Sequence, residues 1–263
     1  MELTTHGELT QGTLLGGRVR YDQPATGFRN GIEPVLLAAS VKARPGQRVL
    51  EAGTGAGAAL LCLTARVGGL DCTGVERDAG LSGLARANAA ANRAPIEIVT
   101  IDITAGDITA GDITAGLAAA PSYHHAIANP PWHRDDATAS PDPRRDDAKR
   151  GRPGLVAAWA LALASVLRPG GTLTMILPAA CIGQAFAAFA ACGCGDRTVA
   201  PLWPKVGRAA KIVLIHGVRR SRGADRVMPG LVLHEPGGAF TAAAESILRE
   251  GAAWAFDQPT SSG

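Results

Sequence analysis

RVLEAGTGAG, residues 48–57, joins a short apolar run to a glycine-rich turn. The apolar run predicts a buried strand over 48–52, and the apolar segment after the turn predicts a helix over 58–67. Glycines at alternate positions let the backbone turn sharply and approach a bound ligand closely. The turn lacks the G-x-G-x-x-G spacing of dinucleotide sites and the Lys-Ser/Thr pair of phosphate-binding loops. Taken alone, it also fits a tight strand-to-helix connection without a ligand.

Strands and helices continue to alternate on both sides of this turn. The sequence predicts further strands at 71–76, 96–101, 124–128, 172–177, 211–218 and 231–235. It predicts further helices at 33–39, 79–92, 155–167, 181–192 and 241–249. This alternation favours an α/β fold with a mostly parallel, seven-stranded sheet and helices on both faces. In such a sheet, ligands bind at the carboxyl ends of the strands.

The length and composition fit one large domain with additions at its two ends, since 46% of the 263 residues are hydrophobic and 19% are charged. We expect an N-terminal arm over 1–31, formed as a short hairpin or an ordered segment. A ligand-binding domain over 32–222 follows, and a strand–helix extension over 223–263 packs on it. Three tandem copies of Asp-Ile-Thr-Ala-Gly fill 102–116. A period of five is too short for a solenoid, so the repeat predicts one lengthened loop.

The net charge, the N-terminal sequence and the cysteines indicate where the protein is located and what it can bind. The net charge of +3 is compatible with nucleic acid but does not argue for it. The first residues lack the basic start and apolar core of a signal peptide, and no run of about 18 apolar residues occurs, so we expect a cytoplasmic protein without a membrane span. The five cysteines include one C-x-C pair without a second cluster, which predicts free thiols and no metal site.

The run Asn129-Pro130-Pro131-Trp132 directly follows the predicted strand 124–128. An amine conjugated to a ring or a carbonyl is a poor nucleophile, because its lone pair is delocalised. A site that methylates such an amine must accept hydrogen bonds from its protons and direct its lone pair at the methyl donor. The Asn129 amide oxygen and the Pro130 carbonyl are two acceptors, and the prolines fix the backbone. The Trp132 ring can stack on a flat group. A proline-rich turn with a buried Trp is the alternative interpretation.

Polar or small groups also follow the first three predicted strands. These are Glu51 with Gly53, Gly55 and Gly57, then Glu76, and then Asp102. Glu76 lies about 20 residues beyond the glycine turn, where a carboxylate can accept hydrogen bonds from ribose hydroxyls. Asp102 could bind the amine of an adenine, although Asp107 or Asp112 of the repeat could take its place. Four successive strands therefore deliver suitable groups to one edge of the predicted sheet.

Together these motifs resemble the class I S-adenosylmethionine-dependent methyltransferases, which have a Rossmann-like fold. Within that class, N-P-P-aromatic is typical of amino methyltransferases that act on adenine N6, guanine N2 or a glutamine amide. The closer resemblance, over nearly the whole chain, is to the bacterial tRNA(Val) adenine-N6 methyltransferases. Its further matches are Leu15-Gly16-Gly17-Arg18-Val19, Gln23-Pro24, Gly27-Phe28-Arg29, Val35-Leu36-Leu37-Ala38-Ala39, Pro201-Leu202-Trp203-Pro204, residues 230–235 and residues 243–249.

The resemblance implies S-adenosyl-L-methionine as the cofactor and direct methyl transfer without a covalent enzyme intermediate. The catalytic residues that it implies are Asn129, Pro130, Pro131 and Trp132. The cofactor-binding residues that it implies are Glu51, Gly53, Gly55, Gly57, Glu76, Asp102, Asn129, Gln23 and Arg29. Gln23 and Arg29, with Phe28, would close the methionine end of the cofactor, although N-terminal packing explains them equally well. The chain departs from the family at Glu51, Thr54 and Trp132, where Asp, Cys, and Tyr or Phe are commoner.

The function that the resemblance implies is N6-methylation of an adenine in RNA, most favourably tRNA, by a monomer. Candidate phosphate contacts are Arg144, Arg145, Lys149, Arg150, Arg152, Lys205, Arg208, Lys211, Arg219, Arg220 and Arg222. The first five alternate with aspartates, so a solvated loop is the alternative interpretation for them. Methylation of a protein glutamine amide, as in a release factor, and of a guanine N2 in ribosomal RNA are alternatives that use the same motif. A methyltransferase-like binding protein without turnover is a third alternative, of a different class.

Overall fold

The computed structural model describes residues 8–25, 31–102, 123–131 and 154–256 of the chain. The strands are β1 (Leu9–Leu14), β2 (Val19–Pro24), β3 (Arg48–Ala52), β4 (Asp71–Glu76), β5 (Ile96–Thr100), β6 (Tyr123–Ala128), β7 (Leu167–Pro178), β8 (Cys194–Trp203), β9 (Ile212–Arg219), β10 (Arg226–Val227) and β11 (Leu231–Val232). The helices are α1 (Glu33–Ser40), α2 (Ala58–Arg66), α3 (Ala79–Ala91), α6 (Leu155–Val166), α7 (Ile182–Ala191) and α8 (Ala242–Glu250), with the short 3-10 turns η1 (Leu15–Gly17) and η2 (Ala179–Cys181).

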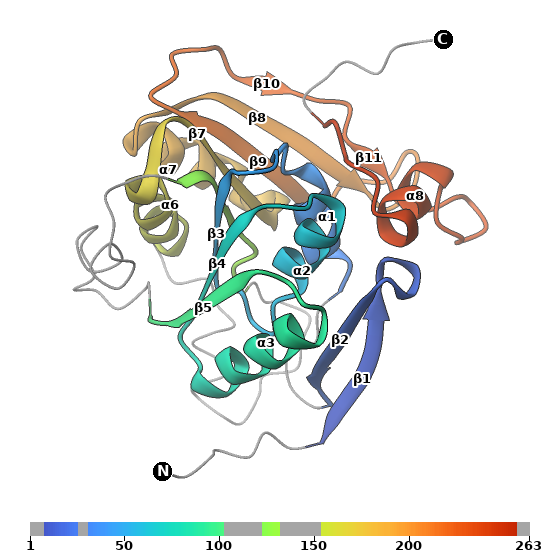
Figure 1. The fold of residues 1–263 in the computed structure, drawn as a ribbon. Helices are drawn as coiled ribbons and strands as arrows, with labels where there is room; N and C mark the ends of the chain where they lie inside the picture. The colour runs from blue at the N-terminus through green and yellow to red at the C-terminus, as the bar shows by residue number, and fades with distance from the viewer. Residues whose placement is uncertain (1–7, 26–30, 103–122, 132–153, 257–263) are drawn as a thin grey trace, which may run out of the picture.

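The large sheet has nine strands in the order β10-β8-β9-β7-β6-β3-β4-β5, with β11 also paired to β8. Seven long strands form its body, and the two-residue strands β10 and β11 are added along β8. Among the described strands of this sheet, only β9 runs antiparallel to its neighbours, which are β7 and β8. The predicted mostly parallel α/β fold is therefore confirmed (Figure 1).

Helices cover both faces of the sheet, as predicted. Successive residues of a strand point to opposite faces, so Val49 and Leu50 belong to two different cores. The first core packs the sheet against α1, α2 and α8, with Leu60 fully buried. The second packs it against α6 and α7, with Leu163 and Phe189 buried. Burial of each such side chain contributes roughly 1.5–3 kcal/mol, which is why both faces need helices.

Strand β8 is the main element that the sequence analysis missed. Its sequence contains Gly195 and Pro201, and such residues argue against a strand. In the structure, Gly195 lies at an irregularity in the pairing with β9. Pro201 lies between the residues that pair with β10 and those that pair with β11, where the ladder on that side is already interrupted. The Gly and Pro residues therefore occupy the two places where the strand tolerates them.

The other predicted bounds agree with the structure to within one residue, with two exceptions. Strand β7 begins at Leu167 instead of 172, because Leu167 already pairs with Tyr123 of β6. Strand β11 ends at Val232 instead of 235, and His234 forms only an isolated bridge to Phe240. All five cysteines are free, as predicted.

The N-terminal arm forms a hairpin, in which β1 and β2 pair from Leu9 with Pro24 to Leu14 with Val19. Its turn, η1, packs against the C-terminal helix α8 (Figure 1). A side chain at Gly16 would lie 2.8 Å from the Arg249 carbonyl oxygen, so the close approach requires glycine. The Arg18 guanidinium also donates to the carbonyl of Glu250. Segments from the two ends of the chain are thus in direct contact.

Candidate functional site

The predicted site residues leave the sheet along one edge. Strand β3 pairs in parallel with β4 and β6, and the register aligns Ala52 with Val75 and with Ala128. The next residues of these three strands are Gly53, Glu76 and Asn129. Neighbouring strands lie about 4.8 Å apart. The glycine turn, the carboxylate and the amide therefore lie side by side at one edge of the sheet.

The glycine turn is closed on one side and open on another. Gly53, Gly55 and Gly57 have φ values of +65°, +55° and +92°, which favour glycine strongly. A Cβ atom at Gly53 would lie 2.6 Å from the Trp159 ring, so α6 packs directly on the turn. A Cβ atom at Gly55 would meet nothing within 4 Å. The backbone at Gly55 therefore faces space that a ligand can enter.

Glu76 is fixed beside this open space. Its Oε2 accepts a hydrogen bond from the Gly55 N–H (2.9 Å), and its Oε1 accepts one from the Asp78 N–H (3.0 Å). The side chain is nearly buried, with 8% of the residue exposed. A carboxylate oxygen has two lone pairs, so each oxygen can accept another hydrogen bond. Two oriented acceptors next to an open glycine turn fit the two hydroxyls of a ribose.

Glu51 is buried beneath the turn, with 2% of the residue exposed. Its Oε2 accepts a hydrogen bond from the Thr54 hydroxyl (2.7 Å), which connects the carboxyl group to the glycine turn. Burial raises the pKa of Glu51 to about 8, against the opposing hydrogen bonds from Thr54 and the Leu60 backbone and with a smaller contribution from the Glu76 charge. At neutral pH, Glu51 is therefore largely protonated.

This shift predicts a pH-dependent stability. Between pH 4.5 and about 8, folded Glu51 binds a proton that the unfolded chain releases, so the free energy of unfolding falls as the pH rises through this window. We expect Glu51→Gln to remove this slope and to stabilise the protein by roughly 3 kcal/mol at pH 7. Urea denaturation at pH 5, 6, 7 and 8 measures the free energy of unfolding and its slope against pH. Glu97→Gln, on the exposed part of β5, is the control. Equal slopes in wild type and Glu51→Gln would contradict the assignment.

Asn129, Pro130 and Pro131 follow β6 at the same edge. Pro130 is buried, while Asn129 and Pro131 are partly exposed. Within the described ranges, the Asn129 side chain makes no hydrogen bond, so its amide oxygen remains available as an acceptor. Trp132 lies outside the described residues.

Asp102 and Gln23 lie outside the three neighbouring strands, β3, β4 and β6, that lead to Gly53, Glu76 and Asn129. Asp102 lies just beyond β5, partly exposed, and its Oδ2 is 3.8 Å from the Arg77 guanidinium. Gln23 is a partly exposed residue of β2. Their roles toward a cofactor stay predictions. Phe28, Arg29, Asp107 and Asp112 lie outside the described residues.

Asn88 is a structural residue of the site that the sequence analysis missed. This side chain of α3, only 3% exposed, donates to the carbonyl of Ala56 in the glycine turn (2.9 Å) and to that of Asp22 in β2 (2.9 Å). It also accepts from the Asp22 N–H (3.0 Å). One turn later, Asn92 makes the same pair of bonds with Arg20. Two Asn residues four apart in an alanine-rich helix were the available signal, because they share one helix face.

We expect Asn88→Ala to loosen the hairpin from the glycine turn. The buried Ala56 carbonyl and the partly buried N–H and carbonyl of Asp22 would lose their partner, which should lower the free energy of unfolding by about 2–3 kcal/mol. Hydrogen exchange should show lost protection at the Asp22 amide. Asn92→Ala, at the more exposed end of α3, serves as the control, because it removes the bonds to Arg20 and to the Asn88 carbonyl but leaves the bonds to Asp22 in place. Full protection of Asp22 in Asn88→Ala would refute this role.

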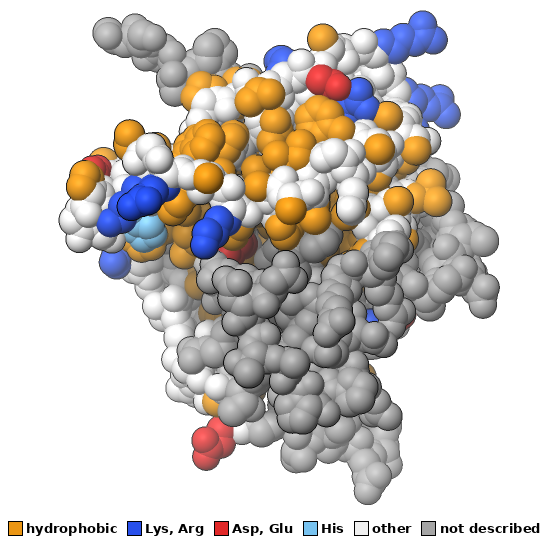
Figure 2. All heavy atoms as spheres, turned by 180° about the vertical axis from the view of Figure 1, so that it is seen from behind, with side chains coloured by type: hydrophobic (Ala, Val, Ile, Leu, Met, Phe, Trp, Pro, Cys, Tyr) orange, Lys and Arg blue, Asp and Glu red, His pale blue; other side chains and the backbone are white. Residues whose placement is uncertain are grey.

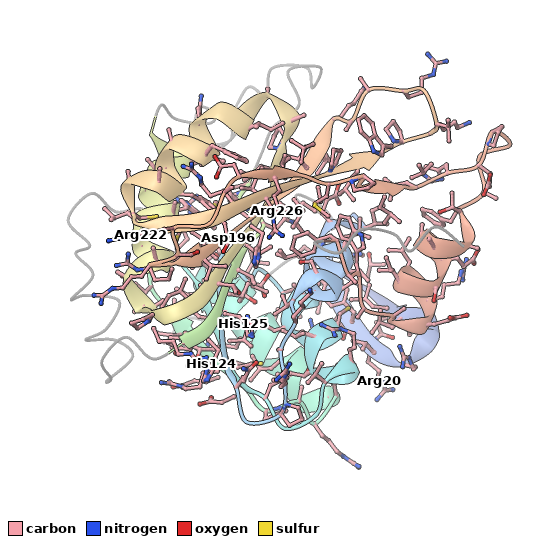
Figure 3. The ribbon with its side chains drawn as sticks, turned by 90° about the horizontal axis from the view of Figure 1, so that it is seen from above. Arg20, His124, His125, Asp196, Arg222 and Arg226 are labelled. Carbon is pink, nitrogen blue, oxygen red and sulfur yellow. The ribbon has the colours of Figure 1, made fainter. Side chains whose placement is uncertain are left out.

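The candidate phosphate contacts separate into two groups at opposite edges. Lys205, Arg208 and Lys211 lie in the loop between β8 and β9, at the edge that carries Asn129. Because β9 is antiparallel, Arg219 ends up at the far edge, where its guanidinium donates to the carbonyls of Cys192 and Ala164. Arg220 and Arg222 follow it there, with Arg222 near Asp196 (Figure 3).

The second group is therefore remote from the proposed site. The other candidates, within 144–152, lie outside the described residues. On the face shown in Figure 2, Lys and Arg side chains form small separate groups with apolar side chains between them.

Two classes of site find no support in the described part of the chain. No group of three or more His, Cys, Asp or Glu residues there is arranged to hold a metal ion. None of the helices in that part has both the length and the apolar character required to cross a membrane.

Comparisons with known proteins identify the fold. No family model and no curated protein matches the chain. The structure of a predicted O-methyltransferase, protein Atu636 from Agrobacterium tumefaciens, is 25% identical with a TM-score of 0.70, over 84% of this chain and 97% of that one. A putative transferase, PH0793 from Pyrococcus horikoshii, is 13% identical with a TM-score of 0.53, over 81% of this chain and 72% of that one, and shows the fold alone.

The chain thus has the fold of class I methyltransferases. The fold and the likeness to the Agrobacterium protein support a methyltransferase enzyme with S-adenosylmethionine as its methyl donor. The residues at the sheet edge are compatible with that cofactor, because Glu76 has two oriented acceptor oxygens beside the open Gly55 backbone.

Proposed function

We propose that the protein methylates the N6 amine of an adenine in RNA, with tRNA as the substrate and S-adenosylmethionine as the methyl donor. The observation that carries this proposal is the position of Asn129 and Pro130. The register of β3 and β6 puts them beside the glycine turn, and the Asn129 amide has no hydrogen-bond partner in the described ranges. An amine has two protons, and this edge offers two acceptors for them.

Each residue has a defined part in this account. When bound, S-adenosylmethionine supplies an electrophilic methyl group. Glu76 would hold the ribose of the cofactor through its two oriented oxygens. The Asn129 amide oxygen and the Pro130 carbonyl would accept the two amine protons, which turns the nitrogen lone pair away from the ring and toward the methyl group. Neither acceptor is basic enough to take a proton at neutral pH, so the surplus proton leaves to water.

Two other chemical groups could receive the methyl group in place of the adenine amine. A glutamine amide presents the same two N–H groups to Asn129 and Pro130, and so does the N2 amine of a guanine. The Agrobacterium protein is described as a predicted O-methyltransferase, so a hydroxyl is a further candidate. A hydroxyl offers one proton for two acceptors and needs a base to remove it. The pair of hydrogen-bond acceptors, Asn129 and Pro130, therefore favours a nitrogen as the atom that receives the methyl group.

A labelling experiment tests the proposal. The purified protein is incubated with methyl-labelled S-adenosylmethionine and with separate RNA and protein fractions from cells that lack the gene. We expect label in the RNA fraction that ribonuclease releases, and none with the Asn129→Ala variant. Label confined to the protein fraction would instead identify a glutamine substrate. The proposal further includes action as a monomer in the cytoplasm.

A further inference from the structure

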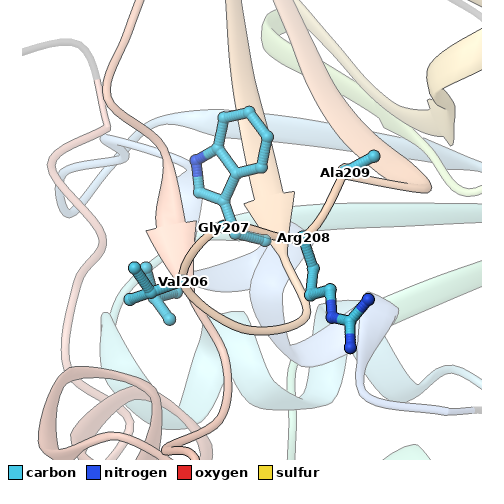
Figure 4. Close-up of a pocket in the computed structure, with 6 residues that line it drawn as sticks. Val206, Gly207, Arg208 and Ala209 are labelled. Atoms are coloured by element: carbon cyan, nitrogen blue, oxygen red, sulfur yellow. The ribbon is translucent and has the colours of Figure 1, made fainter.

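A pocket lies beside the proposed site, where the loop 204–211 connects β8 to β9 (Figure 4). It is lined by Trp203, Val206, Gly207, Arg208, Ala209 and Val232, and its volume is about 450 Å³. Strand β8 runs in the same direction as β6, because β9 is antiparallel to both β7 and β8. The pocket at the end of β8 therefore opens on the same edge as Asn129.

The distance between the two places is short. Strands β7 and β9 separate β6 from β8, so the pocket is three strand spacings, or about 14 Å, from Asn129 along the sheet edge. The Ala179 N–H donates to the Lys211 carbonyl (2.8 Å), which ties the end of the loop to the residue that follows β7. A substrate that extends beyond its reacting group by a few nucleotides can reach both places.

The walls of the pocket suit a flat, apolar group. The Trp203 indole is held by a hydrogen bond from its N–H to the Pro229 carbonyl (2.8 Å). Val206 is 81% exposed, one of the most exposed large apolar side chains of the described residues. A fixed indole and an uncovered valine next to it provide a surface on which a nucleobase can stack.

The charge around the pocket suits a phosphate. Lys205, Arg208 and Lys211 all belong to the loop, and Arg208 and Lys211 are exposed. Neither of these two forms an ion pair with any residue in the described ranges. The Lys205 ammonium group donates to the Pro236 carbonyl (2.9 Å), and the exposed Glu235 next to Pro236 offsets one of the three positive charges. The loop therefore retains a net positive charge beside an apolar wall.

We propose that this pocket binds an unpaired nucleotide of the substrate RNA, a few nucleotides from the methylated adenine. Its base stacks on Trp203 and Val206, and Arg208 contacts the adjoining phosphate. The nucleotide must be single-stranded, because a base within a duplex cannot enter a pocket of this kind. This inference rests on the proposed function, since it assigns the pocket to the same RNA.

Val206→Asp is the central test, because Val206 is too exposed for its replacement to disturb the core. Val227 of β10 is 78% exposed, so Val227→Asp is a matched control outside the pocket. Binding of a fluorescein-labelled single-stranded RNA is measured by anisotropy, and S-adenosylmethionine binding by calorimetry. We expect Val206→Asp to raise the dissociation constant of the RNA at least about fivefold, Val227→Asp to leave it unchanged, and both variants to bind the cofactor normally.

Two further measurements distinguish contacts to the base from contacts to the phosphate. Arg208→Ala should reduce the slope of log affinity against log salt by about one, while Arg168→Ala at the opposite edge should not. An oligonucleotide of abasic residues should bind the wild type more weakly, and Val206→Asp should affect it less. If the abasic and normal oligonucleotides respond equally to Val206→Asp, the pocket does not bind a base.

The outcomes distinguish this inference from the proposed function. If RNA is methylated but Val206→Asp and Val227→Asp bind it equally, the pocket inference fails and the function stands. If no RNA is methylated but Val206→Asp alone weakens RNA binding, the proposed function fails, and the pocket binds a nucleotide without the neighbouring methylated adenine that the inference assigns to it. If the wild type binds no single-stranded RNA, the pocket inference is overturned, and the methylation assay alone decides the proposed function.

Discussion

Asn129→Ala is expected to lower kcat for methyl transfer by about 10²–10³-fold. The Asn129 amide oxygen is one of two acceptors that would orient the target amine, and the alanine side chain offers none. The substitution should leave the affinity for S-adenosylmethionine almost unchanged, because Glu76 and the glycine turn stay in place. Single-turnover methylation with RNA gives the rate, and calorimetry gives the cofactor affinity.

The fold should tolerate this change. Asn129 is partly exposed and has no hydrogen-bond partner in the described ranges, so Asn129→Ala should alter the free energy of unfolding by less than about 0.5 kcal/mol. Asn129→Gln is the matched control, because it keeps the amide but displaces it by one methylene group. We expect it to be nearly as slow as Asn129→Ala. Wild-type turnover in Asn129→Ala would refute the role of the amide.

Glu76→Ala should produce the second large effect, a loss of S-adenosylmethionine affinity of about 100-fold or more. Each hydrogen bond to a charged carboxylate contributes about 1.5–3 kcal/mol, and Glu76 would make two of them with the ribose. The substitution also removes the acceptor of the Gly55 and Asp78 N–H groups, so the free energy of unfolding should fall as well. Calorimetry with the cofactor and urea denaturation measure the two effects.

Two variants separate these contributions. Glu76→Gln keeps the size of the side chain and one acceptor oxygen, so its affinity should lie between those of wild type and Glu76→Ala. Glu97→Gln removes a carboxylate from the exposed surface of β5 and should bind the cofactor normally. If Glu76→Ala and Glu97→Gln have the same cofactor affinity, Glu76 does not hold the ribose.

The edge of the sheet that carries the proposed site could be predicted, because local sequence patterns mark the strands that lead to it. The apolar runs before Gly53 and Asn129 define two buried strands, and parallel strands bring their carboxyl ends to one edge. The strand β8 escaped prediction because Gly195 and Pro201 conceal its pattern. The two-residue strands β10 and β11 depend on pairing with β8, so local sequence could not define them.

The other features that the sequence did not predict depend on contacts between segments that are distant in the sequence. Asn88 binds Asp22 and Ala56, which lie 66 and 32 residues away in the sequence, so no local pattern could show it as the link between hairpin and glycine turn. The positions of Arg219 and Arg208 at opposite edges depend on the direction of β9, which a run of apolar residues does not reveal.

Nucleoside analysis of methylated tRNA tests the central claim most directly. Total tRNA from cells that lack the gene is treated with the protein and methyl-labelled S-adenosylmethionine, digested to nucleosides and separated. The account predicts label in N6-methyladenosine. Label in ribose-methylated nucleosides, or in no nucleoside at all while the cofactor still binds, would contradict it.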